Sequence, residues 1–483
     1  MTAAATPSAR TTHGPVRGVA AAGVLAFLGI PYAAAPVGEL RLRPPQPPRA
    51  WTEVRDCTTH GPTAPQPPPE GPVSELLPHV SVPGDDYLNL NVWTADTEGS
   101  RPVMVFIHGG SFTSGSGSIP TYDGSRFARD GVVLVTINYR LGADGFLWLG
   151  EGTPNLGLLD QIAALEWVRD NIASFGGDPD RVTVFGESAG AMSVCTLLAM
   201  PAAAGLFRRA IAQSGAARCV LSVETAARLG RSLCELLGIE ATREAVTAVP
   251  VSRLLSAQVQ LALDVAGETD PLRWGEDAAR NIMPFEPVVD GNLLPVTPES
   301  AIAAGASAGV DLLIGTNADE GNLFFVPTGI TVQADEEALA RVAQARCYAP
   351  SVVSAYREAR PTATPGELIS ALMTGEFYRA PALELALAHP GSHVYEFAWR
   401  SPAFDGRMGA CHVLELPFVF DTLDDPGYAA VLGDRPPQHV ADAVHRAWVD
   451  FATTGDPGWP AYEATRRTAM RFDTESTQIT GYR

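Results

Sequence analysis

The chain has 483 residues, of which 46% are hydrophobic and 18% are charged, as in globular proteins that bury a large core. All 34 basic residues are arginines, and 54 acidic residues bring the formal net charge to −20. Because such a negative field repels phosphate backbones and anionic lipid surfaces, nucleic acids and membranes are poor candidates for partners.

The N-terminal region shows no targeting signal. Residues 1–10 lack the basic segment and apolar run of a secretory signal, and Gly and Pro interrupt the apolar residues 19–31 well short of the roughly 18 residues of a membrane span. We therefore expect a soluble, cytoplasmic protein. The six cysteines are scattered without CxxC spacing, which predicts mostly buried thiols and neither a metal site nor a disulfide framework.

Elements of an α/β fold follow a proline-rich segment. Residues 31–84 are rich in proline and predict extended surface chain. Three apolar, β-branched runs at residues 102–108, 132–140 and 181–185 are typical of buried parallel strands. Between the last two, apolar residues recur at spacings of three and four over residues 158–172 and predict a helix. Strand, helix and strand in this order indicate a doubly wound sheet.

The C-terminal half continues this pattern. Short strands are predicted at residues 310–315 and 394–399, and an apolar stripe over residues 440–451 predicts a helix that stops near Gly455. No repeat and no long linker divides the chain. We therefore expect residues 1–483 to form one domain with large insertions.

The segment Gly186-Glu187-Ser188-Ala189-Gly190 directly follows a predicted strand and precedes an apolar stretch that can be helical. Strand, sharp turn and helix form the setting in which a nucleophilic serine projects above the sheet edge, and glycines next to it leave room for the strained turn. This context predicts that Ser188 is a nucleophile; the alternative is an ordinary turn serine.

A nucleophilic serine also needs donors for the oxyanion of its tetrahedral intermediate. His108-Gly109-Gly110-Ser111 follows another predicted strand, and the backbone N–H groups of Gly109, Gly110 and Ser111 are expected to act there together with that of Ala189. The alternative is a plain glycine turn. His108 is expected to support this loop rather than to act as the base.

The base and the acid are expected downstream of the serine, with the acid first. The downstream histidines are His389, His393, His412, His439 and His445. We favour His412, which lies in a loop beyond the strand at residues 394–399 and can reach over the sheet end. The acid is expected after the strand at residues 310–315, where Asp319 and Glu320 are adjacent and chemically equivalent.

Several segments along the chain resemble one family. Examples are FLGIPYAAAP at residues 27–36, FGGDPDRVTVFGESAG at residues 175–190 and WVDFATTGDP at residues 448–457. They are similar to the type-B carboxylesterases, which include bacterial para-nitrobenzyl esterases, animal carboxylesterases and cholinesterases. The resemblance covers almost the whole chain. It implies an α/β-hydrolase fold and a serine carboxylesterase that works through an acyl-enzyme without a metal or organic cofactor.

The same resemblance implies roles for single residues. It places the acid on Glu320, the base on His412 and a supporting serine near the triad on Ser214. Glu187 is expected to lie beside the triad, next to the nucleophile. Ser111 occupies a position that the family usually fills with Gly or Ala, and its hydroxyl is expected to narrow the acyl side.

Departures from the family pattern are also visible. The family has a cysteine where this chain has Tyr87, and Ala64 stands at the partner position, so the first family disulfide is expected to be absent. Cys234 resembles one half of a second family disulfide, without a recognisable mate. Residues 65–84 are short and lack Trp, so the aromatic platform that binds choline in cholinesterases has no counterpart.

The expected substrate is a small, neutral ester with apolar parts, and the expected assembly is a monomer or a weak homo-oligomer. Two alternatives remain open at this point. The same triad would serve an amidase, a carbamate hydrolase or a transacylase. The second alternative is a non-catalytic adhesion or scaffolding protein of the family. The presence of Ser188, Glu320 and His412 in this chain argues against that alternative.

Overall fold

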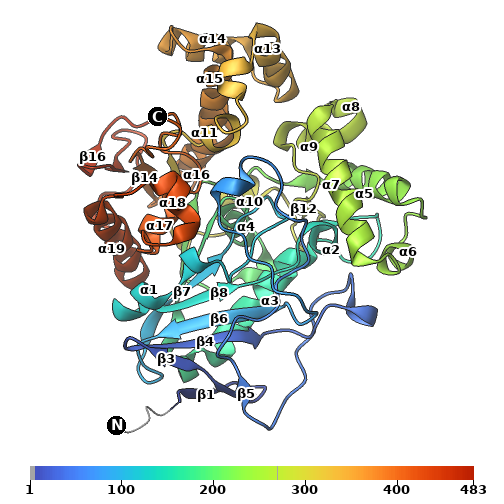
Figure 1. Ribbon diagram of the computed structural model, residues 1–483, viewed down its shortest axis with the longest axis vertical. Coiled ribbons are helices and arrows are strands. Elements are labelled where there is room, and N and C mark those ends of the chain that lie inside the picture. Colours follow the sequence, from blue (N-terminus) through green and yellow to red (C-terminus); the bar gives the residue numbers. More distant parts are fainter. Residues whose placement is uncertain (1–5, 269) are drawn as a thin grey trace.

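One large twisted sheet runs through the computed structural model, which describes residues 6–268 and 270–483 (Figure 1). Within these residues the sheet has 11 strands. In spatial order they are β16 (Thr477–Ile479), β15 (Ala469–Phe472), β14 (His393–Phe397), β13 (Asp311–Asn317), β10 (Arg209–Gln213), β9 (Gly177–Glu187), β7 (Arg101–Ile107), β8 (Val133–Ile137), β6 (Asn89–Thr94), β4 (Val24–Pro31) and β3 (Val19–Ala21). Neighbours from β15 to β8 are parallel, and the outer strands β16, β6, β4 and β3 pair antiparallel. The α/β class predicted from the sequence is confirmed.

The predicted strands and helices are present with small shifts at their ends. The apolar runs correspond to β7, β8, β9, β13 and β14, and the two predicted helices correspond to α3 (Leu156–Asn171) and α19 (Gln438–Thr454). The strand predicted to reach residue 140 ends at Ile137, because Arg140 leaves the sheet to meet Asp160. In residues 31–84 the backbone is mostly irregular, as predicted for a proline-rich segment.

Alternate residues of the central strands face two separate hydrophobic cores. In β7, Val103 and Val105 belong to one core, whereas Met104 and Phe106 belong to the other. The first core includes α3, α4 (Ala189–Leu197) and α16 (Ala380–Ala388), and the second includes α1 (Ser125–Arg129), α17 (Leu416–Val419) and α19. Helices therefore cover both faces of the sheet, as a buried parallel sheet requires.

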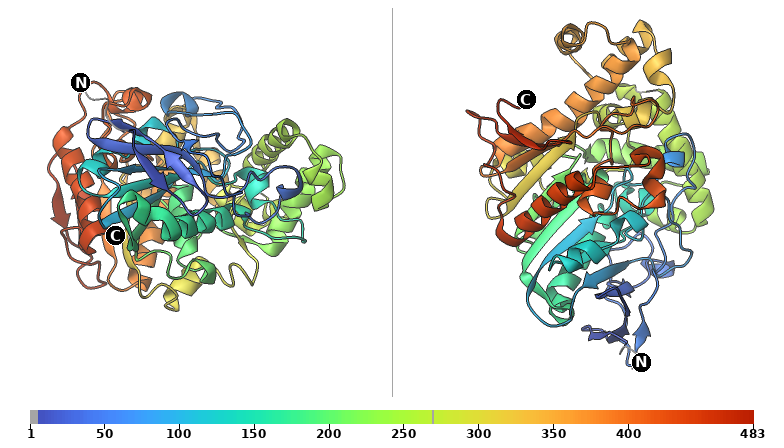
Figure 2. Two further views of the ribbon diagram at one scale, coloured as in Figure 1. Left: turned by 90° about the horizontal axis from the view of Figure 1, so that it is seen from below. Right: turned by 60° about the vertical axis from the view of Figure 1, so that its left-hand side comes forward.

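The remaining helices belong to insertions between the strands (Figures 1 and 2). They are α2 (Gly142–Phe146), α5 (Val223–Leu237), α6 (Arg243–Thr247), α7 (Val251–Gly267), α8 (Pro271–Trp274), α9 (Glu276–Asn281), α10 (Pro298–Ala303), α11 (Asn322–Phe325), α12 (Ile330–Gln333), α13 (Glu336–Ala345), α14 (Pro350–Ala359), α15 (Pro365–Leu372) and α18 (Ala429–Leu432). Helices α13 to α15 share a small core of their own, at the end of the molecule opposite the N-terminus. A π-helical turn, Met373–Arg379, joins α15 to α16. One small sheet contains β1 (Ser8–Arg10), β2 (Pro15–Arg17) and β5 (Arg55–Asp56), with β2 in the middle, and another pairs β11 (Leu221–Ser222) with β12 (Val288–Val289).

All six cysteines are free thiols, and five of them are buried, as predicted; Cys347 is exposed. No helix in the described part of the chain combines the length and the apolar character that a bilayer span needs.

A buried ion pair anchors the chain after β8 to α3. Arg140 and Asp160 contact each other through two N–H···O bonds of 2.7 Å, and their side chains are 1% and 0% exposed. Replacing Asp160 with Ala leaves the guanidinium buried without its carboxylate. We expect this variant to lose about 3–5 kcal/mol of the free energy of unfolding, measured by chemical denaturation. The double variant Arg140→Met, Asp160→Leu should recover much of that loss, and a loss below about 1 kcal/mol in Asp160→Ala would contradict the expectation.

Candidate active site

Ser188 lies on the tight turn between β9 and α4, with φ 55° and ψ −123°. A non-glycine residue holds such a conformation only where its surroundings enforce it. A Cβ atom on Gly190 would lie 1.9 Å from the carbonyl oxygen of Ile107, and one on Gly186 would lie 2.5 Å from the carbonyl carbon of Gly190. The two glycines are therefore required because the turn passes directly against the end of β7.

His412 and Glu320 contact each other; Glu320 lies in the turn after β13 and His412 in the loop after β14. The imidazole Nδ1 lies 2.7 Å from Oε2 of Glu320, and the N–H of His412 donates to the carbonyl oxygen of Glu320 at 3.3 Å. Glu320 is fully buried, and its other oxygen accepts the N–H of Asn317 at 2.7 Å. Asp319 instead contacts Arg400, and its side chain is 30% exposed. The structure thus brings Glu320, and not Asp319, to the histidine.

The other imidazole nitrogen faces the turn that carries the serine. Nε2 of His412 lies 3.1 Å from Oε1 of Glu187, the residue just before Ser188, and both His412 and Ser188 line the same cavity. No hydrogen bond joins the imidazole to the serine hydroxyl in the described chain, and such contacts are often long without substrate and tighten when it binds. Tyr378 and Phe324 pack against the imidazole, with ring centroids 4.9 and 5.4 Å from its own.

Buried carboxylates control the charge of His412. Burial opposes protonation, but the charges of Glu187 and Glu320 outweigh it and raise the pKa of His412 to about 9. Burial also raises the pKa of the Glu187 carboxyl well above its usual range. The imidazole and Glu187 therefore compete for a proton, and the imidazole can accept one from a hydroxyl only when it is itself neutral.

This arrangement predicts how activity depends on pH. Because a general base must be neutral, kcat/KM should rise with pH up to about 9, the pKa of His412. In Glu187→Gln the imidazolium loses a nearby carboxylate, so the pKa of His412 should fall and the acidic limb of kcat/KM should move to lower pH. The pH profile of ester hydrolysis measures this, and a limb that stays in place would contradict it.

The glycine-rich turn after β7 lies directly over Ser188. A Cβ atom on Gly109 would lie 3.0 Å from Cβ of Ser188, and Gly110 and Ser111 have φ of 108° and 53°. Among the described residues, the N–H groups of Gly109, Gly110, Ser111 and Ala189 donate to no acceptor. Unpaired N–H groups that line a cavity are available to an oxyanion.

His108 supports this turn and does not reach the serine. It is buried, its Nδ1 donates to the carbonyl oxygen of Gly109 at 2.8 Å, and its ring stacks on Tyr139. The Tyr139 hydroxyl donates to the carbonyl oxygen of His108 at 2.9 Å. Burial lowers the pKa of His108 to about 4, so the ring stays neutral at physiological pH.

Ser214 lies on the turn after β10, next to the nucleophile turn. The N–H of Ser188 donates to the carbonyl oxygen of Gln213 at 2.9 Å, and a Cβ atom on Gly215 would lie 2.5 Å from the carbonyl oxygen of Ser188. The hydroxyl of Ser214 is buried and has no hydrogen-bond partner in the described structure. Ser214 is thus close to the serine backbone and does not contact the imidazole.

Glu415 is the centre of a buried network of hydrogen bonds next to the triad residues, which was not predicted from the sequence. Glu415 accepts hydrogen bonds from the side-chain amides of Gln213 at 3.1 Å and Asn317 at 2.6 Å, and Trp448 donates to Gln213 at 3.1 Å. Burial, together with the charge of Glu320, raises the pKa of Glu415 to about 7. Its position three residues after His412, before an apolar run, was the available signal, because a carboxylate there has little access to solvent.

Ser188 and His412 open onto a cavity of about 400 Å³. One wall is the glycine-rich turn at residues 109–111, and another comes from the proline-rich segment, whose residues 67–70 and 77–80 line the space. Leu323, Phe324 and Tyr428 add apolar surface. The sequence predicted this segment only as surface chain, because its contact with the site depends on long-range packing. No group of three or more His, Cys, Asp or Glu side chains within the described ranges is placed to hold a metal ion.

Comparisons with known proteins identify the family of the chain. A family model described as "Carboxylesterase family" matches residues 5–482. The chain is 41% identical to the para-nitrobenzyl esterase of Bacillus subtilis, over 97% of this chain and 95% of the relative, and 36% identical to the phenmedipham hydrolase of Pseudarthrobacter oxydans, over 98% and 96%. A solved carboxylesterase from Geobacillus stearothermophilus superposes with a TM-score of 0.86 at 39% identity, covering 98% of each chain. The chain therefore belongs to the carboxylesterase family and is a carboxylic ester hydrolase of the α/β-hydrolase fold.

Proposed function

We propose that Ser188, His412 and Glu320 hydrolyse esters through an acyl-enzyme. The hydroxyl of Ser188 attacks the ester carbonyl carbon while Nε2 of His412 takes its proton. The resulting oxyanion is bound by N–H groups of the turn at residues 109–111 and of Ala189. Protonated His412 then gives its proton to the departing alcohol. Water then attacks the acyl carbon while the same imidazole takes its proton. The bond from the acyl carbon to the serine oxygen breaks, the carboxylic acid leaves, and the imidazolium returns its proton to the oxygen of Ser188.

One observation carries this proposal. The imidazole of His412 lies between the buried carboxylate of Glu320, at 2.7 Å, and the strained turn of Ser188, within a cavity that also contains unpaired N–H groups. Nδ1 must carry the proton that Glu320 accepts, which leaves the lone pair of Nε2 toward the serine side. Base, nucleophile and oxyanion donors thus share one space.

The proposed substrates are small, neutral esters with apolar acyl or alcohol parts. Prolines, Leu77 and Phe324 supply apolar cavity wall, while Glu70 lines the same space and would repel a carboxylate on the substrate. The net charge of −20 acts in the same direction at longer range.

A panel of nitrophenyl esters, nitroanilides and aryl carbamates of matched acyl length tests the proposal. We expect turnover of the esters with a pre-steady-state burst of nitrophenol wherever deacylation is slow. Esters with a carboxylate on the acyl chain should react more slowly than neutral esters of the same length. Absence of turnover on every ester, or a preference for anilides, would refute the proposed reaction.

A further inference from the structure

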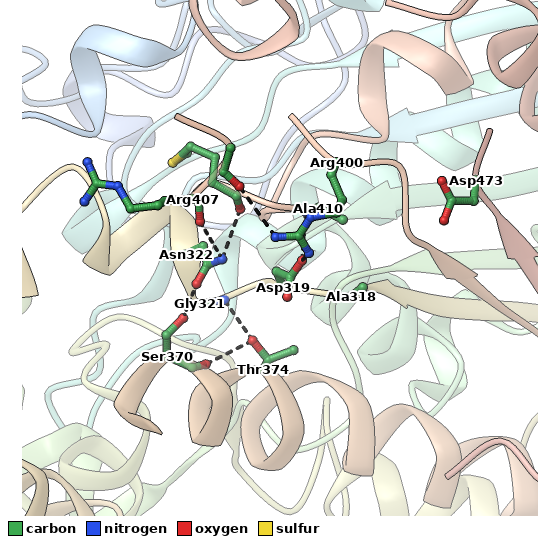
Figure 3. Close-up of polar contacts among 12 residues, drawn as sticks. Ala318, Asp319, Gly321, Asn322, Ser370, Thr374, Arg400, Arg407, Ala410 and Asp473 are labelled. Atoms are coloured by element: carbon green, nitrogen blue, oxygen red, sulfur yellow. Dashed lines mark hydrogen bonds and ion pairs between the residues drawn. The ribbon is translucent and has the colours of Figure 1, made fainter. Parts of the chain in front are cut away.

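The turn that carries Glu320 is hydrogen-bonded to the loop that carries His412. The contact joins Asp319, just before Glu320, to Ala410, and Figure 3 draws both residues. The N–H of Asp319 donates to the carbonyl oxygen of Ala410 at 2.9 Å, and the N–H of Ala410 donates to Oδ2 of Asp319 at 3.0 Å. Ala410 lies two positions before His412. Asp319 is therefore hydrogen-bonded to the histidine loop through both its backbone and its side chain.

This contact leaves little room for movement. Gly409 has φ of 59°, and a Cβ atom there would lie 2.3 Å from Oδ2 of Asp319. On the other side of this glycine, the N–H of Ser401 donates to its carbonyl oxygen at 3.0 Å. The histidine loop is thus held at residues 409–410 by Asp319 and at His412 by the backbone of Glu320.

The acid turn is itself held from a third element. Asn322 donates through its side chain to the carbonyl oxygen of Met408 at 3.1 Å and accepts the hydroxyl of Ser370 at 2.6 Å (Figure 3). The N–H of Gly321 donates to the hydroxyl of Thr374 at 3.0 Å. Because the turn is anchored in this way, Asp319 is held in place, and its hydrogen bonds to Ala410 hold the histidine loop relative to the turn.

The ion pair between Asp319 and Arg400 is expected to contribute little to the stability of the fold. Arg400 donates to Oδ2 at 2.9 Å, but the two side chains are 62% and 30% exposed. Exposed ion pairs contribute little to stability. The bond from the carboxylate to the N–H of Ala410 is more specific, because it fixes one backbone position relative to another.

We propose that Asp319 is a positioning residue, which sets the register of the His412 loop against Glu320 through Ala410. The inference rests on the proposed roles of His412 and Glu320. Misplacing a reacting group by about 1 Å can cost about 100-fold in rate. We therefore expect Asp319→Ala to lower kcat by roughly 10- to 100-fold and to change KM for a neutral nitrophenyl ester by less than about twofold.

The pH profile separates positioning from a general loss of folded protein. The carboxylates facing His412 are Glu187, Glu320 and Glu415, and the ring of Tyr378 packs against it. If the contact with Glu320 loosens, the imidazolium loses stabilisation, and the acidic limb of kcat/KM moves to lower pH. Partial unfolding would scale the whole profile down without moving it.

The experiment compares Asp319→Ala, Asp319→Asn and a control, Asp405→Asn, in the full chain. Asp405 is exposed, lies on the same stretch of chain as Arg400 and forms no ion pair within the described residues. Asparagine keeps an oxygen that can accept the N–H of Ala410, so Asp319→Asn should recover most of kcat. Asp405→Asn should behave as the unmodified chain. Thermal melting reports the folded fraction of each variant.

Two results would overturn the proposal: an Asp319→Ala variant with unchanged kcat, or one whose loss follows its folded fraction with the acidic limb in place. An Asp319→Asn variant as slow as Asp319→Ala would also contradict the role of the bond to Ala410. Failure of the proposed triad would show up separately, as ester hydrolysis that persists in Ser188→Ala.

Discussion

Ser188→Ala and His412→Ala are each expected to lower kcat for a neutral nitrophenyl ester by about 10⁴-fold or more. In the proposed mechanism the serine supplies the attacking oxygen, and the imidazole, 2.7 Å from Glu320, acts as the base that takes its proton. Because the two residues act in one step, the double variant should be about as slow as either single variant. Steady-state kinetics of the three variants measures this.

A histidine outside the site gives the matched control. His439 lies on α19 and contacts the carbonyl oxygen of Thr474 at 2.9 Å, in an exposed position. His439→Gln should retain full activity. Losses in the single variants that multiply in the double variant would indicate two independent contributions and would contradict the shared step.

Glu320→Gln is expected to lower kcat by about 10⁴-fold with a much smaller effect on KM. Oε1 of Glu320 accepts the N–H of Asn317, so the amide oxygen of a glutamine would keep that bond and turn its NH₂ group toward His412. A donor facing Nδ1 stabilises the tautomer with its proton on Nε2, which cannot accept the serine proton. Kinetics combined with thermal melting would separate this effect from loss of folding.

The matched control here is Glu235→Gln, an exposed change on α5 that should leave kcat unaltered. Loss of negative charge beside the imidazole should also lower the pKa of His412 in Glu320→Gln. A Glu320→Gln variant that keeps more than about a tenth of the kcat would mean that the carboxylate does not orient the base, and would contradict the assignment.

The sequence predicted the sheet and the strand, turn and helix around Ser188 for local reasons. Buried parallel strands are continuous apolar runs, and the glycines that flank Ser188 form a recognisable five-residue pattern. The structure adds the long-range reason for one of them, because a side chain on Gly190 would collide with Ile107 of β7. The helices also carry their own signal, since the apolar spacing of α3 and α19 repeats every three or four residues. Only the ends of the elements shifted, as with β8 at Arg140.

Tertiary relations were harder to predict. Asp319 and Glu320 are adjacent and chemically alike, and physical reasoning from the chain alone left both open; family resemblance indicated Glu320. Their separation depends on which side chain the turn after β13 directs to His412 and which to Ala410. The buried position of Glu415 and the proline-rich wall of the cavity likewise result from packing between distant segments. Apart from the apolar run that follows Glu415, the sequence contains no local pattern for such contacts.

The most direct test of the proposed site is the position of a covalent adduct. Full-length protein treated with a neutral fluorophosphonate should carry one adduct, on the peptide that contains Ser188, and digestion followed by mass spectrometry locates it. His412→Ala should slow labelling strongly, because the base that activates the hydroxyl is missing. A stoichiometric adduct on another residue, with ester hydrolysis lost in parallel, would contradict Ser188 as the nucleophile.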